Sequence, residues 1–109
     1  MMTTIKTLHE LKNRSEKFPV ITGYDASFSR LIENAGIEVI LVGDSLGNVI
    51  QGHNTTIPTT INDMIYHTEA VRRGSSKLFV IADLPFMAFS REEQSLDNSA
   101  LLIELGLIW

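Results

Sequence analysis

Two aspartates in this chain follow short apolar runs, and their carboxylates are suited to binding a cation. Val39–Val42 leads into Asp44 through Gly43, and Leu78–Ala82 leads directly into Asp83. A continuous apolar run of this length is typical of a buried parallel strand, and α/β proteins bind ligands at the C-terminal ends of such strands. Carboxylate oxygens suit a hard divalent cation such as Mg²⁺. We therefore expect Asp44 and Asp83 to form a metal site at one edge of a shared sheet.

The same residues also have simpler structural interpretations. Gly43-Asp44 is a common turn sequence, and Asp83 precedes Leu84-Pro85, which also favours a turn. Ser45 could cap a helix or a turn. The residue types and their spacing leave these alternatives open.

Strand and helix patterns alternate along the chain. Strands are expected at 19–22, 39–42 and 78–82, with a fourth beginning at 107–109. Apolar spacing predicts helices at 4–12 and then between Asp25 and Gly36, between Thr60 and Gly74, and between Ser90 and Gly106. Asp25 is a good N-cap, Thr60 with Asp63 resembles a capping box, and Ser90 with Glu93 forms another.

Several other side chains have expected roles outside the aspartate site. The polar connection 43–59 is long for a compact domain, and such a loop is usually functional. Tyr24 should lie near the expected site, either as a packing residue or as a pocket-lining one. His67, in the middle of a predicted helix, should be a packing or hydrogen-bonding residue, and Met64 and Met87 should fill the core.

Composition narrows the class of protein. The chain has 109 residues, enough for one small core, and 44% of them are hydrophobic. A net charge of −4 and nine scattered Lys and Arg residues argue against a nucleic-acid partner. The chain has no cysteine, so it can form no disulfide. No stretch resembles a secretory signal or a membrane span, and we expect a cytoplasmic protein.

Alternating strands and helices predict an α/β fold with right-handed βαβ units and a parallel sheet. A complete (β/α)₈ TIM barrel needs eight such units and roughly 250 residues. We therefore interpret 1–109 as the truncated, N-terminal portion of a single barrel domain. Residues 1–17 would form an N-terminal helix, and 18–109 would hold βα units 1–3 and the start of strand 4. A small open three-stranded α/β domain is the alternative.

Four motifs, in order along the chain, resemble the ketopantoate hydroxymethyltransferase family, also called 3-methyl-2-oxobutanoate hydroxymethyltransferases. The first is Ile21–Asp25, and the second is Val42–Gly47 followed by Gln51-Gly52-His53. The others are Tyr66–Gly74 and Ala82–Met87. Together they extend the resemblance along almost the whole chain.

The resemblance implies a TIM barrel of the phosphoenolpyruvate/pyruvate type in a cytoplasmic, homo-oligomeric enzyme of pantothenate biosynthesis. Its activity would be hydroxymethyl transfer from 5,10-methylenetetrahydrofolate to 3-methyl-2-oxobutanoate, giving 2-dehydropantoate through Mg²⁺-dependent enolate chemistry. Carried over residue by residue, it makes Asp44 and Asp83 metal-site residues. It makes Asp44, Ser45 and Asp83 contacts of the oxo acid.

Three further family residues would fall beyond Trp109: a third acidic metal-site residue, a substrate-binding lysine and a general-base glutamate. The resemblance therefore implies no catalytic residue within the chain, and we expect the isolated chain to be inactive. One alternative is a non-catalytic barrel fragment that is unstable alone or associates with itself or a partner. Another is a related Mg²⁺-dependent oxo-acid enzyme, such as an isocitrate-lyase-like protein.

Overall fold

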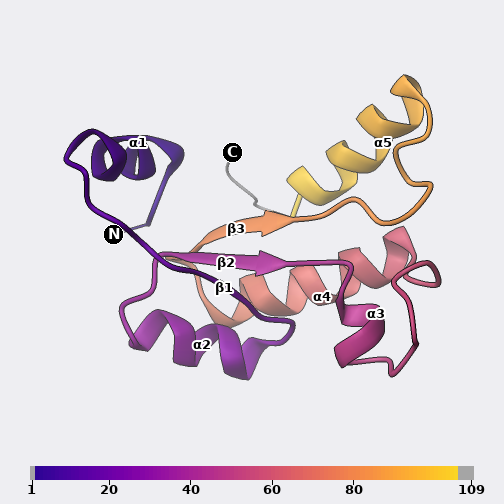
Figure 1. The fold of residues 1–109 in the computed structure, drawn as a ribbon, viewed down its shortest axis with the longest axis horizontal. Coiled ribbons are helices and arrows are strands. Elements are labelled where there is room, and N and C mark those ends of the chain that lie inside the picture. The colour runs from indigo at the N-terminus through magenta and orange to yellow at the C-terminus, as the bar shows by residue number, and fades with distance from the viewer. Residues whose placement is uncertain (1, 106–109) are drawn as a thin grey trace.

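A three-stranded parallel sheet with a helix after each strand organises the chain. A computed structural model describes residues 2–105 (Figure 1). The elements, in chain order, are α1 (Ile5–Asn13), β1 (Val20–Thr22), α2 (Ala26–Asn34), β2 (Val39–Val42), α3 (Leu46–Val49), α4 (Ile61–Gly74), β3 (Phe79–Ala82) and α5 (Glu92–Ile103). The three expected strands are confirmed within a residue or two at their ends. The expected fourth strand at 107–109 and the helix end at Gly106 lie outside the described residues.

The strand order is β1-β2-β3, and both neighbouring pairs are parallel. Val42 of β2 pairs with Ala82 of β3, so the two strands end level with each other. The prediction of successive βαβ units is confirmed. Because of this register, the residues that follow Val42 and Ala82 lie at the same edge of the sheet.

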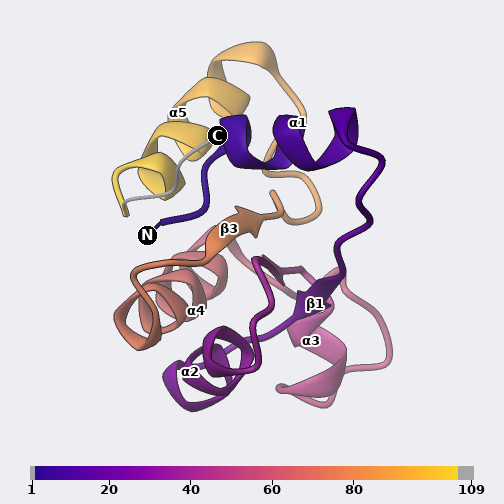
Figure 2. The same cartoon turned by 90° about the vertical axis from the view of Figure 1, so that its left-hand side faces the viewer.

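One face of the sheet packs against α2 and α4, as both views show (Figures 1 and 2). The buried core cluster comprises Ile32, Ile40, Val42, Leu46, Met64, Val71, Leu78, Val80 and Leu102. Helices α2 and α4 approach closely at Gly74, where an added Cβ would lie 2.7 Å from the Cα of Ala26. The last element, α5, packs against α4 and contributes Leu102 to the cluster.

The other face of the sheet is covered only in part among the described residues. Helix α1 lies on this side, near the start of the strands (Figures 1 and 2), and the Thr3 N–H donates to the Lys77 carbonyl at 2.8 Å. Val39 and Phe79 are buried on this face. Further along, Thr22 and Ile81 are exposed. The open part of this face therefore includes the C-terminal ends of β1 and β3.

The predicted N-terminal caps of α2 and α4 are confirmed. Asp25 caps α2, and its carboxylate accepts from the Phe28 N–H at 2.7 Å. Thr60 and Asp63 form the expected capping box of α4. Gly36 follows α2 with φ of +83°, a conformation that favours glycine at the end of a helix.

The predicted capping box at Ser90 is wrong. Helix α5 begins at Glu92, so Arg91 occupies the N-cap position and makes no side-chain capping bond. Ser90 lies one residue too early, and both its N–H and its hydroxyl donate to the Gln94 side chain instead, at 3.0 and 2.7 Å. The partner of Ser90 is thus Gln94, four residues along the chain, and not the predicted Glu93, three residues along.

Two further expectations need correction. The connection 43–59 is not a continuous loop, because α3 forms inside it around the buried Leu46. Met64 is buried as predicted, but Met87 is not a core residue: it is 57% exposed and lies in a turn with φ of +64°.

No helix among residues 2–105 has both the length and the apolarity needed to cross a bilayer.

Candidate functional site

Asp44 and Asp83 lie at the same edge of the sheet, at the ends of neighbouring parallel strands. The Asp83 N–H donates to the Val42 carbonyl at 3.0 Å, which continues the β2–β3 ladder by one residue. The Asp44 N–H in turn donates to Oδ2 of Asp83 at 3.4 Å, a long hydrogen bond. The two residues therefore meet, and an arrangement on opposite edges is excluded.

The electrostatics at this edge are unfavourable for two bare carboxylates. Burial raises the pKa of Asp83, and the nearby charge of Asp44 raises it further, while the hydrogen bond from the Asp44 N–H works in the opposite direction. A cation bound by both carboxylates would offset the cost of burying the Asp83 charge and would remove the repulsion between the two charges. The edge is thus electrostatically suited to a cation.

Gly43 allows two polar side chains to converge. A Cβ built on Gly43 would lie 3.2 Å from Asp83 Oδ2 and 3.2 Å from Ser45 Oγ. Both atoms are held tightly against the glycine backbone, so a side chain at this position would push them apart. The Gly-Asp-Ser sequence therefore has a packing reason here besides its turn preference.

The Ser45 hydroxyl bonds to Tyr24 and is not used for helix capping. Ser45 stands at the N-cap position of α3, but its side chain makes no capping bond. Its Oγ lies 2.6 Å from the phenol oxygen of Tyr24, which comes from the turn after β1. Tyr24 also packs against the core cluster, which confirms the expected packing role of this residue. The turns after all three strands thus contribute a side chain to one place.

Thr59 is a site residue that the sequence reasoning missed. Its hydroxyl donates to the backbone carbonyl of Asp44 at 3.0 Å, and its side chain is only 2% exposed. It also packs against Gly47 of α3. Because Thr59 lies 15 residues from Asp44 in an irregular connection, no spacing rule could have paired them.

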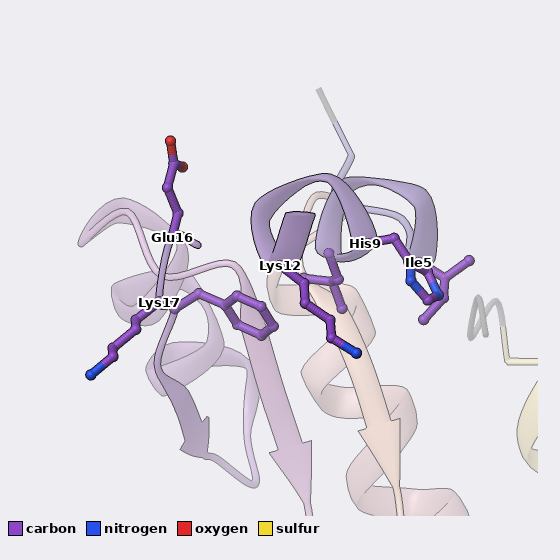
Figure 3. A pocket seen from close by; sticks show the side chains of 7 residues that line it. Ile5, His9, Lys12, Glu16 and Lys17 are labelled. Carbon is purple, nitrogen blue, oxygen red and sulfur yellow. The ribbon is translucent and has the colours of Figure 1, made fainter. Parts of the chain in front are cut away.

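Two cavities lie at different ends of the molecule. One, of about 500 Å³, opens between the end of the long connection and the turn after β3, and its lining includes Thr59, Pro85 and Asn98. The other, of about 600 Å³, lies between α1 and the segment that precedes β1 (Figure 3), and its lining includes His9, Lys12 and Phe18. The second cavity is near the start of the strands, so it is separate from the aspartates.

The donor set fits a hard cation in part. Within residues 2–105 no group of three or more His, Cys, Asp or Glu side chains is arranged to hold a metal ion. Two carboxylates are nevertheless enough for Mg²⁺, which keeps several water ligands and uses few protein groups. The described residues can therefore supply two oxygen ligands, and water or ligand oxygens would have to complete the shell.

The sequence is similar to those of known proteins. A sequence model of the family described as ketopantoate hydroxymethyltransferase matches residues 2–107. The 3-methyl-2-oxobutanoate hydroxymethyltransferase of Idiomarina loihiensis is 52% identical over 104 residues, which are 95% of this chain and 39% of that protein. The 3-methyl-2-oxobutanoate hydroxymethyltransferase 2 of Hahella chejuensis is 51% identical over 106 residues, 97% of this chain and 40% of that protein. The chain spans about two fifths of the length of these relatives.

Solved structures show the same architecture at lower sequence identity. Two crystal forms of 2,3-dimethylmalate lyase, a member of the PEP mutase/isocitrate lyase superfamily, match 98% of this chain. Their TM-scores are 0.69 and 0.70 at 21% and 22% identity, and the match covers 38% and 37% of those chains. This likeness concerns the fold alone. It confirms the expected α/β architecture of part of a TIM barrel.

Proposed function

The chain belongs to the ketopantoate hydroxymethyltransferase family, and from that premise we propose that it serves hydroxymethyl transfer to 3-methyl-2-oxobutanoate. The donor would be 5,10-methylenetetrahydrofolate and the product 2-dehydropantoate. The observation that carries the proposal is the meeting of Asp44 and Asp83 at the C-terminal edge of β2 and β3. Enzymes of barrel architecture place their chemistry at this edge.

In this proposal Asp44 and Asp83 hold Mg²⁺. The bound ion would act as a Lewis acid, stabilising negative charge that develops on the keto oxygen of the substrate. Burial raises the pKa of Asp83, and a cation bound there would oppose that effect because it favours the charged form of the carboxyl. Two oxygen ligands from neighbouring strands leave the remaining positions to water and to the substrate.

Ser45 would bind the carboxylate of the oxo acid. Its hydroxyl is held at the same edge as the aspartates, is half-buried and is not used for helix capping. A hydroxyl donating to a carboxylate forms a charge-assisted hydrogen bond, which is stronger than a neutral one. Ser45 would thereby orient the substrate while the aspartates hold the cation.

Calorimetric titration with 3-methyl-2-oxobutanoate, with and without Mg²⁺, tests this site directly. We expect binding that requires Mg²⁺ and that Asp83→Asn weakens at least about 10-fold, since changes to groups around a metal already cost 10- to 100-fold. Asp97→Asn is the matched control, because Asp97 is exposed on α5, away from the two aspartates. Equal affinity in the two variants would contradict the assignment of Asp83.

Turnover needs a separate measurement, because the chain spans about two fifths of its relatives' length. Formation of 2-dehydropantoate from labelled 3-methyl-2-oxobutanoate and 5,10-methylenetetrahydrofolate is the appropriate assay. If the chain binds the oxo acid in a Mg²⁺-dependent way but forms no product, the assignment of the ligand site stands and the chain alone is not a catalyst. If the affinity for the oxo acid changes neither with Mg²⁺ nor with Asp83→Asn, the proposal is refuted.

A further inference from the structure

The shortest side-chain hydrogen bond described in this chain links Tyr24 to Ser45. The phenol oxygen lies 2.6 Å from Ser45 Oγ, and both residues are half-buried. Tyr24 follows β1 and Ser45 follows β2, so the bond joins the turns after two neighbouring strands. The family resemblance and the metal site gave no reason to expect this contact.

Tyr24 is itself held in place from two sides. Its ring packs against the core cluster. Its backbone carbonyl lies 2.8 Å from Nδ1 of His67, on α4. Because a carbonyl can only accept, Nδ1 of His67 must carry the proton and donate. The phenol is therefore presented to Ser45 by a fixed backbone and a packed ring.

The direction of the Tyr24–Ser45 bond decides what Ser45 can do for a ligand. Each hydroxyl has one proton to donate, and each oxygen can also accept. If Ser45 donated to Tyr24, its only proton would be used. If Tyr24 donates, the Ser45 proton is free for an anionic ligand. A phenol is the stronger acid of the two and hence the stronger donor.

We propose that Tyr24 is a positioning residue: its phenol donates to Ser45 Oγ and so leaves the Ser45 proton free to bind the carboxylate of the oxo acid. This rests on the proposed function, in which Ser45 contacts that carboxylate. Tyr24 acts through Ser45 and needs no contact with the substrate. The turn after β1 thereby contributes to a site whose other groups follow β2 and β3.

Vibrational spectroscopy tests the direction of the bond without any ligand. The chain has only two tyrosines, so Tyr66→Phe leaves Tyr24 as its sole phenol. Tyr66 is 67% exposed, and the substitution keeps the ring that meets His67 edge-on. The Raman tyrosine doublet distinguishes a donating from an accepting phenol. We expect the donor pattern in this variant and its loss when Ser45→Ala is added; an accepting pattern, or no response to Ser45→Ala, overturns the proposal.

Ligand affinity tests the consequence. Tyr24→Phe should weaken Mg²⁺-dependent binding of 3-methyl-2-oxobutanoate about 3- to 10-fold, the range of one neutral hydrogen bond, whereas Tyr66→Phe should not change it. In a Ser45→Ala background, Tyr24→Phe should have no further effect, because Tyr24 acts through Ser45. An equal loss in both backgrounds would show a packing role and overturn the proposal. No binding by the unmodified chain would refute the proposed function, while the Raman experiment would still decide the bond.

Discussion

Gly47 is the position at which one added methyl group should disturb the site from a distance. It is buried in α3, and an added Cβ would overlap the hydroxyl oxygen of Thr59 and lie 3.6 Å from Thr59 Cβ. Thr59 cannot turn aside freely, because it is 2% exposed and its hydroxyl donates to the Asp44 carbonyl at 3.0 Å. In Gly47→Ala, therefore, either the segment that carries Thr59 must shift or the hydrogen bond from Thr59 to Asp44 must break.

Opposing effects set the expected size of the change. Alanine in place of a helical glycine would stabilise the fold by about 0.5–1 kcal/mol if there were space. Overpacking a filled site costs about 1–3 kcal/mol, and losing the hydrogen bond of Thr59 costs about 0.5–1.5 kcal/mol. The clash should prevail, so we expect Gly47→Ala to lower the free energy of unfolding by about 1–2 kcal/mol.

Urea unfolding of a small set of variants measures this and identifies its cause. Thr59→Ala removes the overlapping atom, so Gly47→Ala should become neutral or slightly stabilising in that background. Thr59→Val removes the hydrogen bond but keeps a methyl group in the same place, so it should not rescue Gly47→Ala. If Gly47→Ala stabilised the unmodified chain, or if both Thr59 variants rescued it equally, the reasoning from close packing would be refuted.

Three further predictions concern stability away from the site. The pKa of Asp63 is lowered from its ordinary 3.8, mainly by the hydrogen bond from the Thr60 N–H, so its contribution to stability is full above that value and is lost as the pH falls through the lowered pKa. The urea midpoint should therefore fall on acidification below about pH 4, less so in Asp63→Asn, and Asp97→Asn should behave like the unmodified chain. Met64→Ala should cost about 2–5 kcal/mol in chemical unfolding, because Met64 is fully buried. Met87→Gly should be neutral or stabilising by up to about 1 kcal/mol, since Met87 is exposed at positive φ, and a large loss there would contradict its surface position.

The features predicted correctly are those that depend on neighbours in the sequence or on strict geometry. The N-cap of Asp25 and the capping box of Thr60 with Asp63 involve residues three apart, and both form. The meeting of Asp44 and Asp83 also follows from simple geometry, because parallel strands of similar length end at one edge. Continuous apolar runs were therefore sufficient to predict where two site residues lie.

The features missed depend on contacts between distant segments. Thr59 and Tyr24 reach Asp44 and Ser45 from 15 and 21 residues away, through side chains on irregular connections. Met87 was assigned to the core from its type alone, but the turn after β3 directs it outward. Ser90 failed for a subtler reason: the helix began at Glu92, and a shift of one residue at a helix start exchanges a capping residue for its neighbour.

The charges at this edge constrain the order in which ligands can bind. The Asp44 backbone is held on both sides, by Thr59 at its carbonyl and by Asp83 at its N–H, so the aspartates do not depend on a ligand to come together. An oxo-acid anion approaching them alone would meet charges of its own sign in a half-buried place. In the proposed function, a divalent cation would reverse that sign locally and would have to bind before or together with the oxo acid. Oxo-acid affinity should therefore rise with Mg²⁺ concentration until the metal site is saturated, and an affinity independent of Mg²⁺ would show that the two aspartates do not hold the ion.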